Sequence, residues 1–385
     1  MKCLIVNKAI FATGGIEEYI RQTVSGDYGD IAFTILAHEP KQQRASKKKI
    51  DAFTGADIVL AKIDTTIAHA PVSRDFIQKF KREAESADII HVHMPFPPSA
   101  FAAWLFRKKL VNKKIVVTFH AVPEGKYFFK MLYRPFLNWL LKRADSIIVT
   151  SPVMQGHSDI VRFREKTTVI PCAAKDIGVG KHHDMSYVFA VGRLVPYKGF
   201  EYLINAMITT PYQLIIAGDG PLRTKLQKMI DAAGVAERIV LEGNVSDARL
   251  AFLYKHASIF VLPSVSNGEA FGIVQLEAMS AGLPIVNTDL PTGVPWVARD
   301  GQEAITVRPK SSKDLRDAIV RLITQKKERF TLGANARARF EQLFTISHLQ
   351  QLHSDLYHRL VREDNLNSLK NNTEIKEERT VGEVE

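Results

Sequence analysis

Cysteine and long hydrophobic runs are both scarce in this chain of 385 residues. Its two cysteines, Cys3 and Cys172, lie too far apart in sequence for a disulfide framework or a paired zinc site, so we expect both to be reduced. The opening apolar run is too short for a secretory signal. The apolar segment 131–141 contains Arg134 and Pro135 and is shorter than the roughly 20 residues that span a bilayer. We therefore expect a cytoplasmic protein without a transmembrane helix.

Negative charge is relatively scarce in the first half of the chain. Residues 1–175 contain 27 Lys and Arg against 16 Asp and Glu, and residues 176–385 contain 25 of each, so the first half carries the whole net charge of +11. A basic surface can face nucleic acid, anionic lipid or a phosphorylated substrate, and charge alone does not choose among them. Since the sequence contains no recognisable nucleic-acid-binding module, we expect no nucleic-acid partner.

Short β-rich runs alternate with helical stretches twice along the chain, which predicts two Rossmann-like α/β domains with parallel sheets. The length agrees, because single cores rarely grow this large. We place an N-terminal acceptor domain at 1–176, a linker at 177–184 and a C-terminal donor domain at 185–345. A helix at 346–362 follows and is free to return to the first domain. The polar, charged tail 363–385 is predicted to be disordered.

A basic pair lies where a ligand should bind. In open α/β sheets, ligands bind beyond the carboxyl ends of the strands. The first strand of the second domain runs into Arg193 and Lys198, just before a helix that we expect to begin near Gly199. Two cations and the amide groups of a helix start can bind a diphosphate. The alternative interpretation is a pair of solvated loop charges.

Two glutamates follow the fourth predicted strand of the second domain. Glu269 lies just before a helix expected to start near Gly272, and Glu277 lies about a turn and a half into it. The free amide groups of Phe271, Gly272 and Ile273 would face an anion, while the carboxylates can accept hydrogen bonds from sugar and ribose hydroxyls. This combination suits a nucleotide sugar. The alternatives are a helix cap for Glu269 and an exposed helix position for Glu277.

Taken in order, the segments GRLVPYKG, AGDGPLR, EGNV and EAFGIVQLE resemble the donor domain of family-4 retaining glycosyltransferases. The likeness covers about residues 1–360 and is strongest from Gly192 to Thr306. It implies the GT-B fold, in which two Rossmann-like domains face each other across a cleft. It also implies that the enzyme moves a sugar from a nucleotide diphosphate to an acceptor with retention, without a metal and without a cofactor.

The resemblance also implies roles for individual residues. Arg193 and Lys198 would bind the donor diphosphate, Glu269 the transferred sugar and Glu277 the ribose. His120 would contact the transferred sugar near the reacting centre. Since both cations would meet charge that grows in the transition state, removing either should slow turnover while leaving the fold intact.

The complete set of candidates is larger. The catalytic candidates are Arg193, Lys198, Glu269 and His120. The donor-binding candidates, which include a glycine loop beside the phosphates and a segment beside the base, are Gly14, Gly15, Gly192, Arg193, Lys198, Asn244, Val245, Glu269, Ala270, Phe271, Gly272, Ile273 and Glu277. His91 and His93 have the spacing of metal ligands, but no carboxylate or cysteine cluster accompanies them. We interpret these two as cleft or core residues and expect no metal.

Two departures from the family pattern bear on the substrate. Cys172-Ala173-Ala174 stands where many relatives have an Asn-Gly turn, and LPTGVPWV, with Trp296, stands where many have a glycine pair and a glutamate. This variant resembles the mannosyltransferase branch that serves bacterial O-antigen and related polysaccharides. Our first hypothesis is therefore α-linked transfer of mannose from GDP-mannose to a lipid-linked or growing surface polysaccharide. The alternatives are a UDP-sugar-dependent hexosyl- or N-acetylhexosaminyltransferase, and a noncatalytic sugar-nucleotide-binding or scaffold protein.

Two segments of the first domain interleave basic and aromatic residues, at 107–114 and 126–143. The second of these could lie on anionic lipid, with Lys126, Lys130, Lys142 and Arg143 facing the membrane. The alternative is a core helix with solvated lysines. We predict peripheral binding to the cytoplasmic face of the inner membrane, with an anionic membrane surface and a lipid-linked acceptor as partners.

Overall fold

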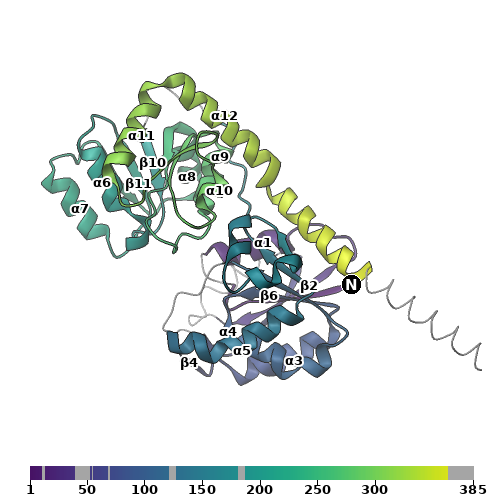
Figure 1. Ribbon diagram of the computed structural model, residues 1–385. Helices are drawn as coiled ribbons and strands as arrows, with labels where there is room; N and C mark the ends of the chain where they lie inside the picture. The colour runs from purple at the N-terminus through teal and green to yellow at the C-terminus, as the bar shows by residue number, and fades with distance from the viewer. Residues whose placement is uncertain are drawn as a thin grey trace, which may run out of the picture. The chain divides into compact units, whose positions relative to one another are not determined.

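The structure is a computed structural model that forms two compact units (Figure 1). It describes residues 1–10, 14–39, 53, 55–67, 70–120, 127–180 and 187–362. The first unit consists of Met1–Ile148, Arg162–Ile170 and, within the described residues, 350–362; the second consists of Val149–Val161 and Pro171–Leu349.

The boundaries of the units differ from the predicted ones. The chain passes into the second unit at Pro171 rather than at 177, because residues after Ile170 make their contacts there: the amide of Ala174, for example, donates to the carbonyl of Phe344 at 3.1 Å. The helix at 346–362 leads back into the first unit from Gln350 onward. Part of the predicted linker, 181–184, and the predicted disordered tail, 363–385, lie outside the described residues.

The first unit is built on a seven-stranded sheet in the order β3-β2-β1-β6-β7-β8-β9. Its strands are β1 (Lys2–Val6), β2 (Ala32–His38), β3 (Ala56–Ala61), β6 (Ile89–Met94), β7 (Lys114–Phe119), β8 (Ser146–Val149) and β9 (Thr167–Val169). The pairs β1–β2, β2–β3, β1–β6 and β6–β7 are parallel. Every residue of β6 is buried, as expected for a central strand covered on both faces.

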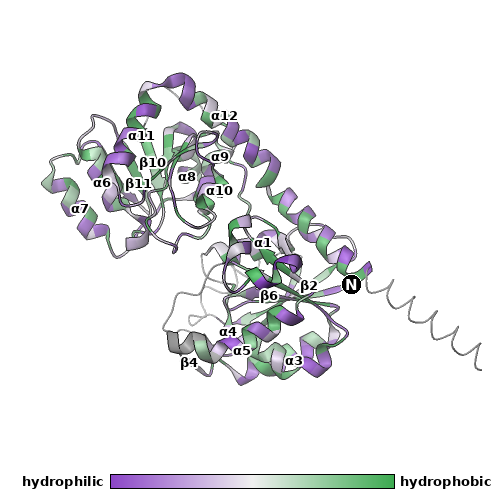
Figure 2. Ribbon diagram, viewed as in Figure 1, coloured by the Kyte–Doolittle hydropathy of each residue, from purple (hydrophilic) through white to green (hydrophobic). Residues whose placement is uncertain are grey.

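Helices cover this sheet on both faces. They are α1 (Gly15–Val24), α3 (Arg74–Ser86), α4 (Pro97–Leu105) and α5 (Tyr127–Arg143), with short 3-10 turns η2 (Arg107–Leu110) and η4 (Val161–Lys166) and a small antiparallel pair, β4 (Thr65–Ile67) and β5 (Ala70–Val72). In Figure 1, α3, α4 and α5 lie together on one face and α1 on the other. Helix α3 illustrates this packing, because Phe76, Phe80 and Ala84 form one buried stripe. Figure 2 shows both hydrophilic and hydrophobic segments along this helix.

The second unit contains a six-stranded sheet in the order β12-β11-β10-β13-β14-β15, and all its neighbouring strands are parallel. The strands are β10 (Tyr187–Val191), β11 (Leu214–Ala217), β12 (Ile239–Gly243), β13 (Ala257–Val261), β14 (Ile285–Thr288) and β15 (Ala304–Val307). The helical elements are η3 (Pro152–Gly156), η5 (Pro196–Lys198), α6 (Phe200–Ile208), α7 (Arg223–Ala232), α8 (Asp247–His256), α9 (Ile273–Ser280), α10 (Val294–Val297), α11 (Ser312–Thr324) and α12 (Lys326–Leu343). The prediction of two Rossmann-like α/β sheets is therefore confirmed.

The strand order reverses direction once in each sheet, between β1 and β6 and between β10 and β13. At such a point, the loops leaving the two central strands diverge to opposite faces and leave a crevice at the carboxyl edge. Ligand-binding residues are therefore expected after β1 and β6 in the first unit and after β10 and β13 in the second.

Both cysteines are buried and unpaired, as predicted. Burial raises the pKa of the Cys172 thiol to about 12 and raises that of Cys3 as well, so both stay protonated at neutral pH. None of the helices within the described ranges is long and apolar enough to cross a membrane.

The helix at 346–362 is part of the core of the first unit. His353, Leu356, Tyr357 and Leu360 are buried. The hydroxyl of Tyr357 lies 2.7 Å from Nδ1 of His91, on the central strand β6. The last described helix therefore completes the core around β6.

We predict that Tyr357→Phe lowers the free energy of unfolding by about 1–3 kcal/mol, because it leaves a buried nitrogen of His91 without its partner. Chemical denaturation measures this. The matched control is Tyr212→Phe, since Tyr212 is half-buried and its hydroxyl makes no hydrogen bond to a described residue. Equal unfolding curves for the two variants would contradict the prediction.

Candidate functional site

The basic pair that was predicted to bind a diphosphate, Arg193 and Lys198, lies at the switch point of the second sheet, in the loop that follows β10. Arg193 is exposed, and its guanidinium makes no hydrogen bond or ion pair with any described residue. Lys198, in contrast, is only 8% exposed. The two cations that the sequence suggested as a pair therefore differ in environment: one is free for a ligand, and the other is held by the protein.

Lys198 forms a buried ion pair with Glu269, which follows β13. Its Nζ lies 2.5 Å from Oε2 of Glu269, and the hydroxyl of Ser264 donates to the same oxygen at 2.8 Å. Glu269 is 7% exposed, and Ser264 is fully buried. Since both known partners of the carboxylate bind Oε2, the other oxygen, Oε1, has no protein donor among the described residues and is open to a ligand hydroxyl.

Close backbone packing brings the two loops together. The amide of Val265 donates to the carbonyl of Tyr197 at 2.8 Å. Gly199 has φ +68°, and a Cβ there would overlap the carbonyl oxygen of Pro263. Glycine is therefore required at 199 both for the left-handed backbone and for the approach that places Lys198 against Glu269.

Helix α9 begins next to this pair, with Gly272 as its N-cap residue, close to the predicted start. Gly272 has φ +75°, and a Cβ there would lie 2.8 Å from Cδ2 of Leu262. The first amides of a helix have no acceptor within the helix, so those of Ile273 and its neighbour offer partial positive charge at this end. The predicted helix start is therefore present, with Phe271 and Gly272 themselves buried.

Glu277 is half-buried on α9, and the hydroxyl of Tyr254 donates to its Oε2 at 2.7 Å. Burial raises the pKa of this carboxyl, which lies beside the phenol of Tyr254. The alternative of a freely exposed helix position is therefore wrong for Glu277. Tyr254 was missed in the sequence, where it appears only as an apolar position of helix α8.

The remaining donor candidates of the second unit lie on loops at the same edge of the sheet. Gly192 directly follows β10, and a Cβ on it would come within 3.2 Å of Cε of Lys198. Asn244 and Val245 follow β12, the outermost strand on that side, with Asn244 exposed. The structure brings Lys198, Glu269 and the start of α9 into direct proximity, and it leaves Asn244 two strands away from β10.

In the first unit, Gly14 and Gly15 open helix α1 after β1. The carboxylate of Glu17 lies against Gly14, so that a Cβ at Gly14 would overlap Oε2 of Glu17. Burial raises the pKa of this carboxyl. A phosphate at Gly14 would meet Glu17, and this side chain has to move or take up a proton before the glycine pair can serve as a phosphate loop.

His120 directly follows strand β7 and belongs to a buried group of histidines. Its Nε2 lies 2.8 Å from Nδ1 of His93, and the two rings are stacked. Burial lowers the pKa of His120 to about 3 and that of His93 well below its ordinary value, so both rings are neutral at pH 7. His120 is therefore a neutral hydrogen-bonding group.

The alternative metal interpretation of His91 and His93 has no support in the described part of the chain. The two ring nitrogens of His91 lie 2.7 Å from the hydroxyl of Tyr357 and 2.6 Å from that of Thr118. No three His, Cys, Asp or Glu side chains within the described ranges are placed to hold a metal ion. The interpretation as core residues fits both histidines.

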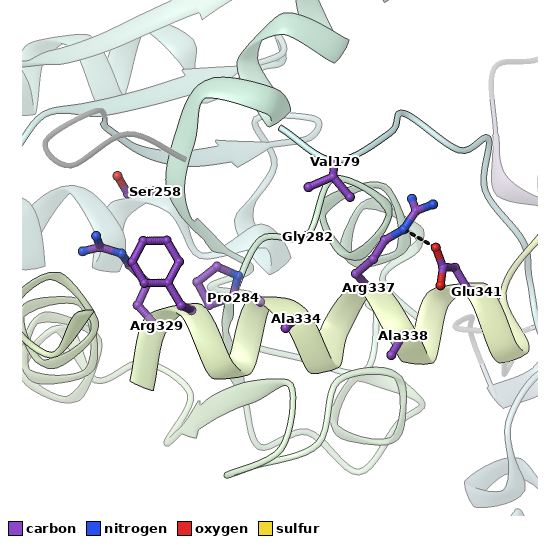
Figure 3. A pocket seen from close by; sticks show the side chains of 11 residues that line it. Val179, Ser258, Gly282, Pro284, Arg329, Ala334, Arg337, Ala338 and Glu341 are labelled. Carbon is purple, nitrogen blue, oxygen red and sulfur yellow. Dashed lines mark hydrogen bonds and ion pairs between the residues drawn. The ribbon is translucent and has the colours of Figure 1, made fainter. Parts of the chain in front are cut away.

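A cavity of about 410 Å³ in the second unit lies elsewhere (Figure 3). Ser258, near the start of β13, and Pro284, just before β14, line it together with Arg329 and Arg337 of α12. The amino ends of β13 and β14 thus border this cavity, whereas the candidate residues follow carboxyl ends. Arg337 is also engaged by Glu341, as Figure 3 shows, and by Asp176. The cavity is therefore separate from the donor candidates.

Comparisons with known proteins match both halves of this chain. The family model described as Glycosyltransferase Family 4 matches residues 13–175, and the one described as Glycosyl transferases group 1 matches 174–339. D-rhamnosyltransferase WbpZ of Pseudomonas aeruginosa is 29% identical over 347 residues, which are 86% of this chain and 88% of that protein. O-antigen chain mannosyltransferase C of Escherichia coli is 27% identical over 374 residues, 93% of this chain and 98% of that protein.

Among solved structures, HepE of Anabaena in complex with UDP superposes with a TM-score of 0.77 at 19% identity and covers 93% of this chain and 100% of that one. At this identity the likeness establishes the fold. Together with the two family models, which meet near residue 174, it accounts for both Rossmann-like units.

The buried pair argues against the expectation that Lys198 can be removed with the fold intact. We predict that Lys198→Met and Glu269→Gln each destabilise the protein, the first by about 3–5 kcal/mol, because each leaves an uncompensated buried charge. The double variant should lose clearly less than the sum, since it leaves neither charge. Urea unfolding of the four proteins measures the coupling.

The matched control is the exposed pair Lys313–Asp317 in α11, whose side chains are 73% and 48% exposed. The double-mutant cycle of Lys313→Met and Asp317→Asn should show no measurable coupling between their effects on the free energy of unfolding. Additive losses at Lys198 and Glu269 would mean that the two side chains do not form the pair in solution.

Proposed function

Because this chain belongs to the family-4 and group 1 glycosyltransferases with the GT-B fold, we propose that it transfers a hexose from a nucleotide diphosphate to a lipid-linked or growing surface polysaccharide. One observation carries the proposal. The buried pair of Lys198 and Glu269 lies at the switch point of the second sheet, beside the start of α9. A cation, a carboxylate and helix amides at one point suit the junction between a diphosphate and a sugar.

The pair can serve the donor without being broken. An ammonium group has three N–H donors, and only one is needed for Glu269, so two are left for diphosphate oxygens. Arg193 adds an exposed guanidinium that has no protein partner among the described residues. Oε1 of Glu269 is left to accept a hydrogen bond from a sugar hydroxyl. Glu277, held by Tyr254, has one carboxylate oxygen left for ribose.

The chemistry follows from these positions. Negative charge grows on the β-phosphate oxygen as the bond to the sugar breaks, and preorganised cations and amides stabilise it. We propose that Arg193, Lys198 and the first amides of α9 supply this stabilisation without a metal. Glu269 is held by Lys198 and Ser264 and serves the sugar as an acceptor rather than as a nucleophile. We therefore propose attack by the acceptor hydroxyl on the face that the phosphate leaves, with the departing phosphate taking the hydroxyl proton, which gives retention and an α-linked product.

GDP-mannose is our first choice of donor. The name of one relative, an O-antigen chain mannosyltransferase, supports it, whereas another relative is named a D-rhamnosyltransferase. Trp296, part of the sequence variant that suggested mannose, packs against Phe271 and Phe344, with Arg339 over its ring. Trp296 therefore packs on the core side of the loop that precedes α9 and helps to shape that loop. A UDP-sugar is the alternative donor, as in the HepE complex with UDP.

The membrane proposal needs a different surface from the one that the sequence suggested. Arg143 donates to Asp145 and to the carbonyls of Leu110, Val111 and Lys113, so it holds the fold together and does not face lipid. The core alternative therefore holds for the second half of α5, where Leu137, Leu140 and Leu141 are buried. Lys126 and the side chain of Lys130 lie outside the described residues; Lys142 is exposed.

Helices α4 and α5 offer a better surface. Phe101 and Leu105 are exposed on α4, Trp104 and Phe136 pack edge to face, and the guanidinium of Arg107 lies over the ring of Trp104. We call these five residues the α4–α5 surface. Exposed aromatic and aliphatic side chains beside cations suit the interface of an anionic membrane. We propose that this surface brings the protein to the cytoplasmic face of the inner membrane, where a lipid-linked acceptor would be found.

We predict that the protein sediments with vesicles containing phosphatidylglycerol at low salt, much less with neutral vesicles, and is released at high salt. The triple variant Phe101→Ser, Leu105→Ser and Arg107→Gln should bind several-fold less, because it removes apolar area and a cation worth roughly 1 kcal/mol at such a surface. The matched control is Arg316→Gln on α11 of the second unit. If the wild-type protein does not sediment with anionic vesicles at low salt, the membrane proposal is ruled out.

We predict nucleotide release from GDP-mannose, faster than from UDP-sugars, when the purified protein is supplied with a polyprenyl-diphosphate-linked oligosaccharide, and we expect excess EDTA to leave it unchanged. Arg193→Ala should lower turnover more than tenfold at an unchanged melting temperature, because an ionic hydrogen bond of about 1.5–3 kcal/mol is lost in the transition state. Arg316→Ala is the control.

The other outcomes distinguish the alternatives. Release from UDP-sugars alone favours the UDP-sugar enzyme, and activity restored by Mg²⁺ or Mn²⁺ after EDTA contradicts the metal-free mechanism. Tight nucleotide binding without turnover on any donor favours the noncatalytic interpretation.

A further inference from the structure

His93 lies at the centre of the first unit, on strand β6, and the proposed transfer gives it no role. It is 1% exposed and lies between two other rings: His91, with centroids 4.4 Å apart, and His120, with centroids 5.1 Å apart and planes at 16°. Its Nδ1 lies 2.8 Å from Nε2 of His120. Its Nε2 is buried and has no hydrogen-bond partner among the described residues.

The hydrogen bond between Nδ1 of His93 and Nε2 of His120 contains a single proton. Burial favours the neutral form of both histidines, so each ring carries a single N–H. At 2.8 Å one nitrogen must donate and the other accept. Either Nδ1 of His93 donates to Nε2 of His120, or Nε2 of His120 donates to Nδ1 of His93.

The unpartnered nitrogen of His93 decides between these two arrangements. If His120 donated, the proton of His93 would be on Nε2, as a buried N–H without an acceptor. If His93 donates, its Nε2 is only a bare lone pair. Buried N–H groups without a partner are rarer than acceptors without one. The structure therefore favours His93 as the donor, with the proton of His120 on Nδ1.

We propose that His93 is a positioning residue that fixes His120 in the Nδ1–H tautomer, so that His120 offers the substrate a hydrogen-bond donor. The proposal rests on the proposed sugar transfer, in which His120 contacts the donor. The group that His120 binds is then an oxygen that accepts, such as a sugar hydroxyl oxygen or a phosphoryl oxygen. No described residue bonds to Nδ1 of His120, which belongs to a side chain that keeps 8% of its surface accessible.

The neighbourhood is suited to holding this geometry. The ring of Tyr19 meets His120 edge to face, with centroids 4.9 Å apart and planes at 84°, and it meets His93 in a similar way at 6.1 Å. The backbone amide of His120 donates to the carbonyl of Met94 at 3.2 Å, which fixes the end of β7 against β6. Packing therefore holds both rings in place. The position of the shared proton then decides whether the other nitrogen of each ring is a hydrogen-bond donor or an acceptor.

The test reads the tautomer directly. Protein labelled with ¹⁵N at histidine is studied by long-range ¹H–¹⁵N NMR at neutral pH, and the signals of the two rings are assigned by their loss in His93→Leu and His120→Gln. We expect wild-type His120 to carry its proton on Nδ1. In His93→Asn the amide N–H takes the place of Nδ1–H, so the tautomer should be retained. In His93→Leu, which has no donor, it should shift toward Nε2–H.

Turnover supplies the second measurement. His93→Leu should lower kcat roughly three- to tenfold, as expected for one lost neutral hydrogen bond, and His93→Asn should recover most of it. Tyr357→Phe is the matched control, because it perturbs the same histidine group through His91 without touching the pair, and it should leave the tautomer of His120 unchanged.

A proton on Nε2 of His120 in the wild-type protein overturns the proposal, as does a His93→Leu variant with an unchanged tautomer. Equal losses of turnover in His93→Leu and His93→Asn would reduce His93 to a packing residue. The spectrum decides the tautomer even if no donor is turned over, so failure of the proposed function would be seen separately.

Discussion

A parallel sheet whose strand order reverses leaves two loops to diverge at its carboxyl edge, and in the second unit these are the loops after β10 and β13. The site formed by Lys198 and Glu269 depends on this reversal of strand order. It places Lys198 and Glu269, which are 71 positions apart in sequence, within 2.5 Å of each other. Burial then makes the pair interdependent, because either charge alone would be costly to keep away from water. Gly199 and Gly272 permit the close backbone contacts on which the arrangement relies.

The first unit uses the same topology for a different purpose. Beside its switch point, strand β6 and the residue after β7 present histidines rather than cations, and burial keeps His91, His93 and His120 neutral. The last described helix, 346–362, closes this group through Tyr357. The first unit therefore presents neutral hydrogen-bonding groups near its switch point, while the second unit presents charged groups at its own.

Net positive charge and an exposed apolar surface are separate properties of the first unit. The sequence excess of cations includes Arg143, which donates to three carbonyls and a carboxylate, and Lys109, which pairs with Glu85. Arg143 is held by the fold, and the charge of the exposed Lys109 is offset by the carboxylate beside it. Exposed apolar side chains on α4, with Arg107 beside them, form the surface that we propose for the membrane. Only side-chain contacts separate cations that stabilise the fold from those that can meet a partner.

The sequence by itself determined two Rossmann-like sheets, the start of α9 near Gly272, and the set of residues at strand ends, because these depend on local periodicity and on motifs that are contiguous. It could not show that Lys198 is buried against Glu269, that Ser264 and Tyr254 hold the two carboxylates, or that Arg143 is structural. It also placed the first boundary at 176 instead of 170. These depend on contacts between residues distant in the chain, which the tertiary structure decides by bringing strands into register and burying some polar groups but not others.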